Sequence, residues 1–205
     1  MSKKLVIIGA GGHAKVVANV AELNGYTDIV FLCEDPDLKE FIGYPVVGNS
    51  SNYDGYEDWD FIIAIGNCED RERIYNNLEE KGFNIVTLIH PSAVIADSVK
   101  IGKGTVVMVG AIINPYSEIG NGCIINTAAT IDHDNIISDF THISVGAHLG
   151  GTVNVGKCTW VGIGAIVSNN KNICGKCIVG AGAVVTKDIT ECGTYLGIPA
   201  RKAEK

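Results

Sequence analysis

The sequence has little positive charge and no cluster of lysines or arginines. Its 205 residues include 16 Lys and Arg against 23 Asp and Glu, which gives a formal net charge of −7 at pH 7. A protein without a basic patch is not expected to bind nucleic acid. The chain also lacks a basic and apolar leader, and it lacks an apolar run long enough to cross a bilayer. We therefore expect a cytoplasmic protein with no nucleic acid partner and no membrane insertion.

A period of six residues runs through the second half of the chain. Steps of six from Ile89 to Val185 meet an aliphatic residue at every stop. A helix repeats every 3.6 residues and a strand every two, so neither explains this spacing. A parallel β-helix of hexapeptide repeats does, because each repeat is one short strand and a corner. We number the six places of each repeat so that place 1 is the aliphatic residue, whose side chain is expected to fill the interior of the β-helix. Places 2 and 5 often hold small residues.

Residues 1–88 precede the repeat and are expected to form a separate domain from residues 89–205, which hold the repeat and a C-terminal tail that leaves the period at Gly193. A strand at 4–8, a glycine-rich turn and a helix to about Asn24 predict a Rossmann-like unit, whose helix N-terminus can receive a phosphate. Further strands are predicted at 29–33, 60–65 and 84–88, and a helix at 70–81. Fewer than 90 residues cannot supply two mononucleotide halves, so a site for one nucleotide with an attached sugar fits better than a complete NAD site. A glycine turn without any ligand is the alternative.

The cysteines number seven and are scattered through apolar patterns, which favours reduced thiols over disulfides. Cys174 and Cys177 form a C-x-x-C pair, a spacing found in metal and redox sites. They also fall on places 2 and 5 of one hexapeptide, where small residues belong. We favour this structural interpretation and predict no metal site.

Places 3, 4 and 6 of each repeat are expected to face outward. His133 and Asp134 take places 3 and 4. A carboxylate beside an imidazole raises its basicity, so this pair is a candidate general base, although an outward histidine is often only a solvated side chain. Gly151 lies one 18-residue coil after His133 and is expected to leave open space beside it. His142 lies half a coil from His133, so the two histidines could share a site only across a subunit boundary.

An outward apolar column is predicted along one side of the tube. Val145, Ile163 and Ala181 follow one another at steps of one coil. Such a column is a candidate groove for the pantetheine arm of a coenzyme A derivative.

Several motifs together resemble a known family. They include Gly-Ala-Gly-Gly-His at 9–13, Phe-Ile-Ile-Ala-Ile-Gly-Asn at 61–67, Ile-Asp-His-Asp at 131–134 and Gly-Ile-Pro-Ala at 197–200. The chain is similar over nearly its whole length to hexapeptide-repeat sugar acetyltransferases with an N-terminal Rossmann-like domain. This family includes UDP-4-amino-sugar N-acetyltransferases of bacillosamine synthesis, which are the nearest branch, and sialic-acid O-acetyltransferases.

The resemblance implies a left-handed β-helix, a homotrimer and acetyl-CoA bound between neighbouring subunits. It implies that His133 is the general base, with Asp134 standing where the family has glutamate. Acetyl-CoA contacts are implied for His142, Gly151, Ile163 and Ala181, the last replacing a family glycine. Contacts to the nucleotide-sugar are implied for Gly11, Gly12, His13, Cys33, Glu34 and Gly66, with Asn126 near the acceptor sugar.

The function favoured by the sequence is acetyl-CoA-dependent N-acetylation of a nucleotide-linked 4-amino-4,6-dideoxy sugar, with UDP as the expected nucleotide, for bacterial glycan synthesis. O-acetylation of sialic acid or a related sugar needs the same base and cofactor and stays open. A sugar-nucleotide-binding scaffold without catalysis is the alternative outside enzymes. An NAD-dependent oxidoreductase is disfavoured by the size of the first domain.

Overall fold

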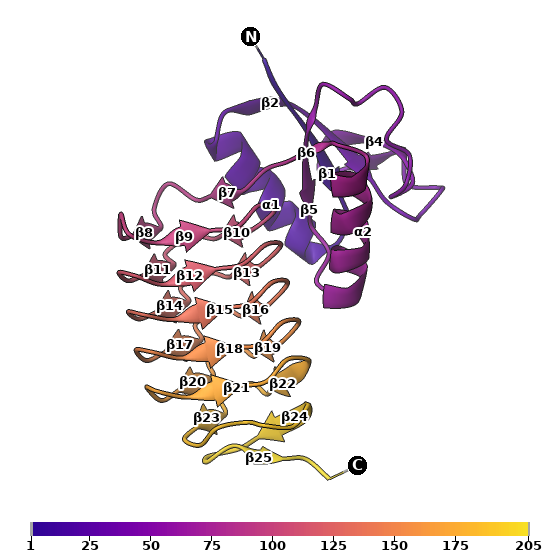
Figure 1. Cartoon of the computed structure of the whole chain (residues 1–205). Helices are drawn as coiled ribbons and strands as arrows, with labels where there is room; N and C mark the ends of the chain where they lie inside the picture. Colours follow the sequence, from indigo (N-terminus) through magenta and orange to yellow (C-terminus); the bar gives the residue numbers. More distant parts are fainter. Residues whose placement is uncertain (1, 205) are drawn as a thin grey trace. The chain divides into compact units, whose positions relative to one another are not determined.

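The computed structural model describes residues 2–204, in two compact units, Met1–Pro91 and Ser92–Lys205 (Figure 1). The first unit is an α/β domain, and the second is a parallel β-helix. Both parts of the predicted fold class are confirmed. None of the helices within residues 2–204 is long and apolar enough to cross a membrane.

The first unit is built around a sheet in the order β3-β4-β2-β1-β5-β6. Its strands are β1 (Lys3–Ile8), β2 (Tyr26–Leu32), β3 (Glu40–Phe41), β4 (Tyr44–Gly48), β5 (Asp60–Ile63) and β6 (Asn84–Ile85). The central strand β1 pairs in parallel with β2 and β5, and its last four residues are fully buried. Helix α1 (Gly12–Leu23) packs on β1 and β2, and α2 (Cys68–Glu80) packs on β5 and β6. A short strand β7 (Leu88–Ile89) ends the unit.

The predicted strands and helices of this unit are confirmed, with small shifts of their ends. The predicted strand at 84–88 is divided into β6 and β7. The hairpin of β3 and β4 was not predicted, because each strand is short. Its turn is Ile42-Gly43, where both residues have positive φ, and this is the conformation of tight hairpin turns. Phe41 and Tyr44 pack against Phe31 with ring centroids 5.2 and 6.1 Å away, which holds the hairpin on the sheet.

The second unit stacks three parallel sheets along residues 92–204. The first contains β8 (Val94–Ile95), β11 (Ile112–Ile113), β14 (Thr130–Ile131), β17 (His148–Leu149), β20 (Ile166–Val167) and β23 (Val184–Val185). The second contains β9 (Lys100–Ile101), β12 (Glu118–Ile119), β15 (Ile136–Ile137), β18 (Asn154–Val155) and β21 (Asn172–Ile173). The third contains β10 (Val106–Val107), β13 (Ile124–Ile125), β16 (His142–Ile143), β19 (Trp160–Val161), β22 (Cys177–Val179) and β24 (Gly193–Leu196), edged by antiparallel β25 (Arg201–Lys202).

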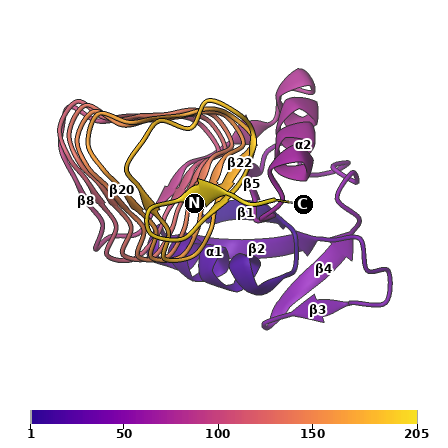
Figure 2. The same cartoon turned by 90° about the horizontal axis from the view of Figure 1, so that it is seen from below.

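The coil length of the β-helix follows from the strand pairing. From β8 to β23, paired strands lie 18 residues apart, as Thr130 of β14 and His148 of β17 do, whereas Cys177 of β22 pairs with Gly193 of β24, 16 residues later. Figure 2 looks along this stack and shows the successive coils superimposed. The predicted register is also confirmed. The aliphatic stops from Val107 to Val185 are buried, and place 5 is buried as well in this range except at Lys171, even where it holds Ser117 or Asn135.

The corners of the coils depend on two backbone features, a close approach of neighbouring coils and a left-handed residue. At place 2, glycine permits close approach of the coils: a Cβ on Gly120 would lie 2.6 Å from the backbone nitrogen of Asp139. At place 4, the backbone is left-handed in corner after corner, including Asp134 at φ 58° and Phe140 at φ 58°. The left-handed backbone at place 4 was not predicted from the sequence, because residues other than glycine often occupy this place.

Candidate functional site

His133 and Asp134 lie in the corner that follows β14, and their side chains form one unit. The Nδ1–H of His133 donates to Asp134 Oδ2 over 2.7 Å. The left-handed backbone of Asp134 aims its carboxylate back at the ring, and aspartate tolerates this conformation better than most residues. The hydrogen bond to Asp134 raises the pKa of His133 above its usual value. With Nδ1 bound, Nε2 is the nitrogen left to accept a proton.

Asp132 supports the same corner from the other side. Its Oδ1 accepts from the backbone N–H of His133 over 2.9 Å and from Asn114 Nδ2 over 3.0 Å. The Asn114 hydrogen bond is the largest cause that lowers the pKa of Asp132, so this carboxylate is ionised at neutral pH. Its charge also helps to raise the pKa of His133.

The His133 ring lies against Gly151 of the next coil. A Cβ on Gly151 would lie 2.5 Å from His133 Nε2 and 2.6 Å from Cε1, which is far inside contact distance. The expectation of open space beside the histidine is therefore wrong, because the imidazole itself fills it. Among the described residues, the N–H of Gly151 has no hydrogen-bond partner. A basic ring nitrogen and a free backbone donor thus lie next to each other.

His142 and Asn126, predicted to bind different ligands, are brought together on the sheet of β13 and β16. Asn126 Nδ2 donates to His142 Nε2 over 3.0 Å, and Asn126 Oδ1 accepts from the N–H of Thr127 over 2.8 Å. The His142 ring also stacks on Trp160 with centroids 5.8 Å apart and planes 3° apart. The sequence analysis missed Trp160, although it lies one coil after His142 and could have been found by that spacing.

Two of the three residues of the apolar column predicted from coil spacing line a hollow of about 180 Å³, and Val145 does not. Ile163 and Ala181 lie in it together with Trp160 and Ile178. Ile163 is 56% exposed although it is aliphatic. The walls of this hollow belong to β19, β22 and the corners after them. His133 and Gly151 follow β14 and β17, which belong to another sheet. As the spacing predicted, His133 and His142 lie on different faces of the tube.

In the first unit, the glycine-rich turn joins β1 to α1. Gly9 has φ 111°, and a Cβ there would lie 2.9 Å from the carbonyl oxygen of Ala64, so the turn requires glycine. Gly11 and Gly12 face open space, with no atom within 4 Å of an added Cβ. Gly11 caps α1 without a side-chain hydrogen bond, so the first N–H groups of the helix are available to a ligand.

The buried side chain of Arg71 bonds to the loop that contains Gly66, and its charge acts on His13. His13 Nε2 is buried without a hydrogen-bond partner among the described residues. Burial, and after it the charge of Arg71, lowers the pKa of His13 to about 4, so the ring is neutral at pH 7. Arg71 is 1% exposed and donates to the carbonyl oxygens of Ile65 and Gly66 over 2.8 and 2.9 Å. The sequence analysis missed Arg71, because its helical position gives no sign of these loop contacts.

Cys33 and Glu34 follow β2 and line a hollow of about 380 Å³. The Cys33 thiol is buried and lies 3.8 Å from the carbonyl oxygen of Asp35, while Glu34 is exposed and accepts a hydrogen bond from Ser50 Oγ. Because β2, β1 and β5 are adjacent and parallel, the loops with Glu34, Gly11 and Gly66 lie at one edge of the sheet. Ligands of open α/β sheets bind at this carboxyl edge.

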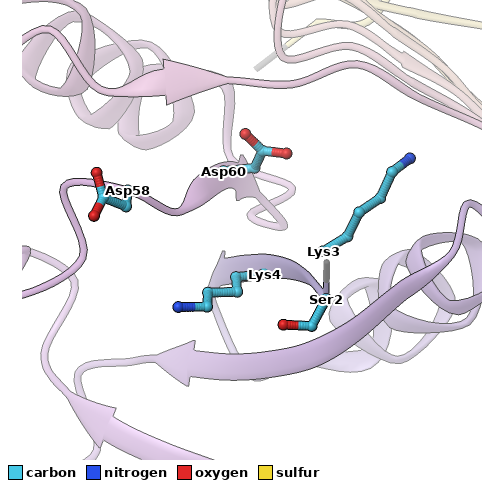
Figure 3. Close-up of a pocket in the computed structure, with 5 residues that line it drawn as sticks. All are labelled: Ser2, Lys3, Lys4, Asp58 and Asp60. Carbon is cyan, nitrogen blue, oxygen red and sulfur yellow. The ribbon is translucent and has the colours of Figure 1, made fainter.

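The opposite edge of the sheet has a hollow of about 520 Å³ lined by Ser2, Lys3, Lys4, Asp58 and Asp60 (Figure 3). Two of its charged groups, Lys3 and Asp60, are hydrogen-bonded within the chain. Lys3 Nζ donates to the carbonyl oxygen of Asn24 over 3.2 Å. The Asp60 carboxylate accepts from Tyr26 Oη and from Asn84 Nδ2, each over 2.6 Å. We assign no ligand to this amino edge.

The C-x-x-C pair lies in the corner before β22. The Sγ atoms of Cys174 and Cys177 are 3.4 Å apart, and all seven cysteines are free thiols. Burial is the largest cause that raises the pKa of Cys177 to about 12, so this thiol stays protonated at neutral pH. No group of three metal-binding side chains occurs within residues 2–204.

Comparison with known proteins finds relatives for both units. Residues 4–78 match the PglD N-terminal domain family. UDP-N-acetylbacillosamine N-acetyltransferase of Bacillus subtilis is 38% identical over 111 residues, which are 52% of this chain and 51% of the relative. The chain thus aligns with about half the length of this curated relative.

Solved structures match nearly the whole chain. The acetyltransferase domain of PglB from Neisseria gonorrhoeae, in complex with acetyl coenzyme A, is 40% identical with a TM-score of 0.94 and aligns over 99% of this chain and 100% of its own. PerB from Caulobacter crescentus, in complex with CoA and GDP-perosamine, is 37% identical with a TM-score of 0.93 over 98% and 97% of the two chains.

Proposed function

Because the chain belongs to the family of hexapeptide-repeat sugar N-acetyltransferases, we propose that it transfers an acetyl group from acetyl-CoA to a nucleotide-linked 4-amino-4,6-dideoxy sugar. UDP is the proposed nucleotide, and the product serves bacterial glycan synthesis. The cytoplasmic location stays a prediction. The observation that carries the proposal is the His133–Asp134 pair, with its free Nε2 next to the unpaired N–H of Gly151.

His133 is the proposed general base. An amine at neutral pH is mostly ammonium and cannot attack a carbonyl until it loses a proton. His133 Nε2 accepts this proton, directly or through a water molecule, while Asp134 holds Nδ1–H and stabilises the imidazolium that forms. The raised pKa of His133 brings its basicity closer to that of the amine.

Gly151 is the proposed oxyanion donor. Acetyl-CoA supplies the acetyl group as an activated thioester. The amine nitrogen bonds to the carbonyl carbon, collapse of the tetrahedral intermediate breaks the C–S bond, and the departing CoA thiolate takes a proton from the imidazolium of His133 while the new amide nitrogen loses its remaining excess proton to water. The N–H of Gly151 donates to the carbonyl oxygen as this atom gains negative charge during attack. The proposal is supported by the position of Gly151 against the His133 ring, which brings a backbone donor close to the base.

The apolar column is the proposed path of the pantetheine arm. Ile163 and Ala181 offer exposed apolar surface, and Trp160 adds a ring face. His142 is held in place by Asn126 and Trp160 and is proposed to contact acetyl-CoA beside this column. Asn126, with one amide hydrogen still available, is proposed to lie near the acceptor sugar.

The carboxyl edge of the first unit is the proposed nucleotide-sugar site. The open backbone at Gly11 and Gly12 suits the diphosphate, because helix N-terminal N–H groups attract anions. His13, whose ring is neutral at pH 7, is the second residue of helix α1 and is proposed to contact the nucleotide-sugar. Cys33 and Glu34 form the wall of the adjoining hollow, and Gly66 completes the edge.

We propose a homotrimer in which one active site takes His133 from one subunit and the apolar column from its neighbour. The two lie on different sheets of one tube, so a single subunit cannot bring them together. The sheet that runs from β8 to β20 also exposes Val94, Ile112 and Ile166, and this face, with the hydrogen-bonded pair Thr130 and His148 between Ile112 and Ile166, is proposed for subunit contact. Light scattering should give a trimer mass; a stable monomer at assay concentration contradicts the shared site.

The proposed reaction is tested by incubating the protein with acetyl-CoA and a panel of UDP-, GDP- and dTDP-linked 4-amino sugars. The expected result is CoA release that is fastest with the UDP-linked 4-amino-4,6-dideoxy sugar, together with an N-acetylated product by mass spectrometry. Sialic acid serves as the control acceptor. Release with sialic acid and none with any amino sugar overturns the proposal in favour of O-acetylation.

A further inference from the structure

A fully buried amide lies directly beneath the proposed base. Asn135 occupies place 5 of the repeat that carries His133 and is 0% exposed. A buried polar side chain is retained only when it is well hydrogen-bonded, since an unpaired amide in the core is costly. The pattern of its hydrogen bonds therefore shows what it holds in place.

Asn135 bonds to two consecutive coils at once. Its Nδ2 donates to the carbonyl oxygen of Asp132 over 2.7 Å and to that of Gly150 over 3.0 Å, with a longer shared contact of 3.3 Å to the carbonyl of His133. Its Oδ1 accepts from the N–H of Val153 over 3.1 Å. One amide thus ties the corner of the base to the coil that carries the oxyanion donor.

The bond to Gly150 acts on the donor itself. The carbonyl of Gly150 and the N–H of Gly151 belong to the same peptide group, which is planar. Fixing the carbonyl therefore fixes the direction of the N–H. Donation to the carbonyl also polarises the peptide and strengthens its N–H as a donor.

Neighbouring coils show what a simpler residue does at place 5. Ser117 lies one coil before Asn135 in the same column; its Oγ donates to the carbonyl of Asp132 over 2.7 Å and accepts from the N–H of Asn135 over 3.2 Å. Thr105 makes the same pair of bonds, to the carbonyl of Gly120 and from the N–H of Cys123. A hydroxyl thus links one coil to the next. The amide of Asn135 keeps this link and adds bonds to its own corner.

We propose that Asn135 is a positioning residue that sets the base His133 and the N–H of Gly151 at a fixed separation. It acts on the base through the carbonyls of Asp132 and His133, and on the donor through the carbonyl of Gly150. The inference rests on the proposed acetyl transfer and adds a residue to its machinery.

Two substitutions separate the bonds of Asn135 to its own corner from its bond to Gly150. Asn135→Val removes both kinds of bond, and the buried Val153 in the next coil shows that valine fits this place. Asn135→Ser keeps the link to Gly150, as Ser117 does one coil earlier, and loses the bonds to its own corner. Thr105→Val is the matched control, because it removes a buried bond of the same kind far along the chain from His133.

The measurement is kcat by CoA release, with the KM for acetyl-CoA and the thermal midpoint of each variant. A misplacement of about 1 Å costs roughly 10²-fold in rate. Asn135→Val should therefore lower kcat by roughly 10- to 100-fold with a nearly unchanged KM, Asn135→Ser should lose less, and Thr105→Val should keep its kcat. If the valine variant does not fold, the serine variant carries the test.

A double-mutant cycle distinguishes positioning from a structural role. In a His133→Ala background the base is gone, so Asn135→Ser should cost almost nothing further. An undiminished loss in that background, a loss of equal size in Thr105→Val, or full kcat in both Asn135 variants overturns the inference while the acetyl transfer stands. No CoA release by the unchanged protein refutes the proposed function, and this inference with it.

Discussion

Gly151→Ala is the substitution for which the structure gives the sharpest expectation. The added Cβ would lie 2.5 Å from His133 Nε2, whereas ordinary contact begins near 3.4 Å. The ring must therefore retreat by about 1 Å. Because the His133 side chain is 56% exposed, it can swing toward solvent, and the fold should lose little stability.

The expected cost falls on the rate. A base displaced by about 1 Å from its working position costs roughly 10²-fold in kcat. CoA release measures this loss, and the thermal midpoint checks the fold. In a His133→Ala background the clash is absent, so Gly151→Ala should cost almost nothing there. If Gly151→Ala alone keeps near-full kcat, the ring does not lie against Gly151 in the working enzyme.

Three further predictions follow from the side chains of both units. Asp134→Asn, which tolerates the left-handed backbone at φ 58°, should move the acid limb of the kcat/KM profile to lower pH, because the lost carboxylate no longer raises the pKa of His133; an unmoved limb contradicts their coupling. Trp160→Ala should raise the KM for acetyl-CoA more than the KM for the sugar nucleotide, since Trp160 lines the apolar column directly and reaches Asn126 only through its stack on His142; the reverse would misplace the pantetheine arm. The pKa of His13 is about 4 in the folded protein and about 6.5 in the unfolded chain. The free energy of unfolding that depends on neutral His13 is therefore complete above pH 6.5 and falls by about 3 kcal/mol as the pH drops to 4. Urea unfolding measured across this pH range should show the fall in the unchanged protein and not in His13→Phe.

Much of the second unit could be predicted from sequence, because its repeat fixes which residues face inward. Every coil up to β23 has the same length, so one register assigns buried and exposed places along this part of the tube. The same arithmetic correctly separated His133 from His142 and placed Gly151 beside the base. The prediction of open space beside His133 was wrong, because the spacing of residues gives the position of a Cα and not the direction in which a neighbouring ring points.

The residues that were missed owe their roles to tertiary contacts. Asn135 appeared to be one more inward residue, and only its bonds to two coils reveal more. Arg71 lies on a helix with nothing in the sequence to mark its loop partners, Ile65 and Gly66. Trp160 could have been found, since it follows His142 by one coil.

The central claim is that His133 removes the proton of the attacking amine. The direct measurement is kcat of His133→Ala across pH 6 to 9, with the Kd for acetyl-CoA determined by calorimetry. A positioned base contributes roughly 10²–10⁴-fold, so kcat should fall by that factor while the Kd stays nearly unchanged. Near-full kcat across this pH range would contradict the account, because the base would then lie elsewhere or the amine would arrive already deprotonated.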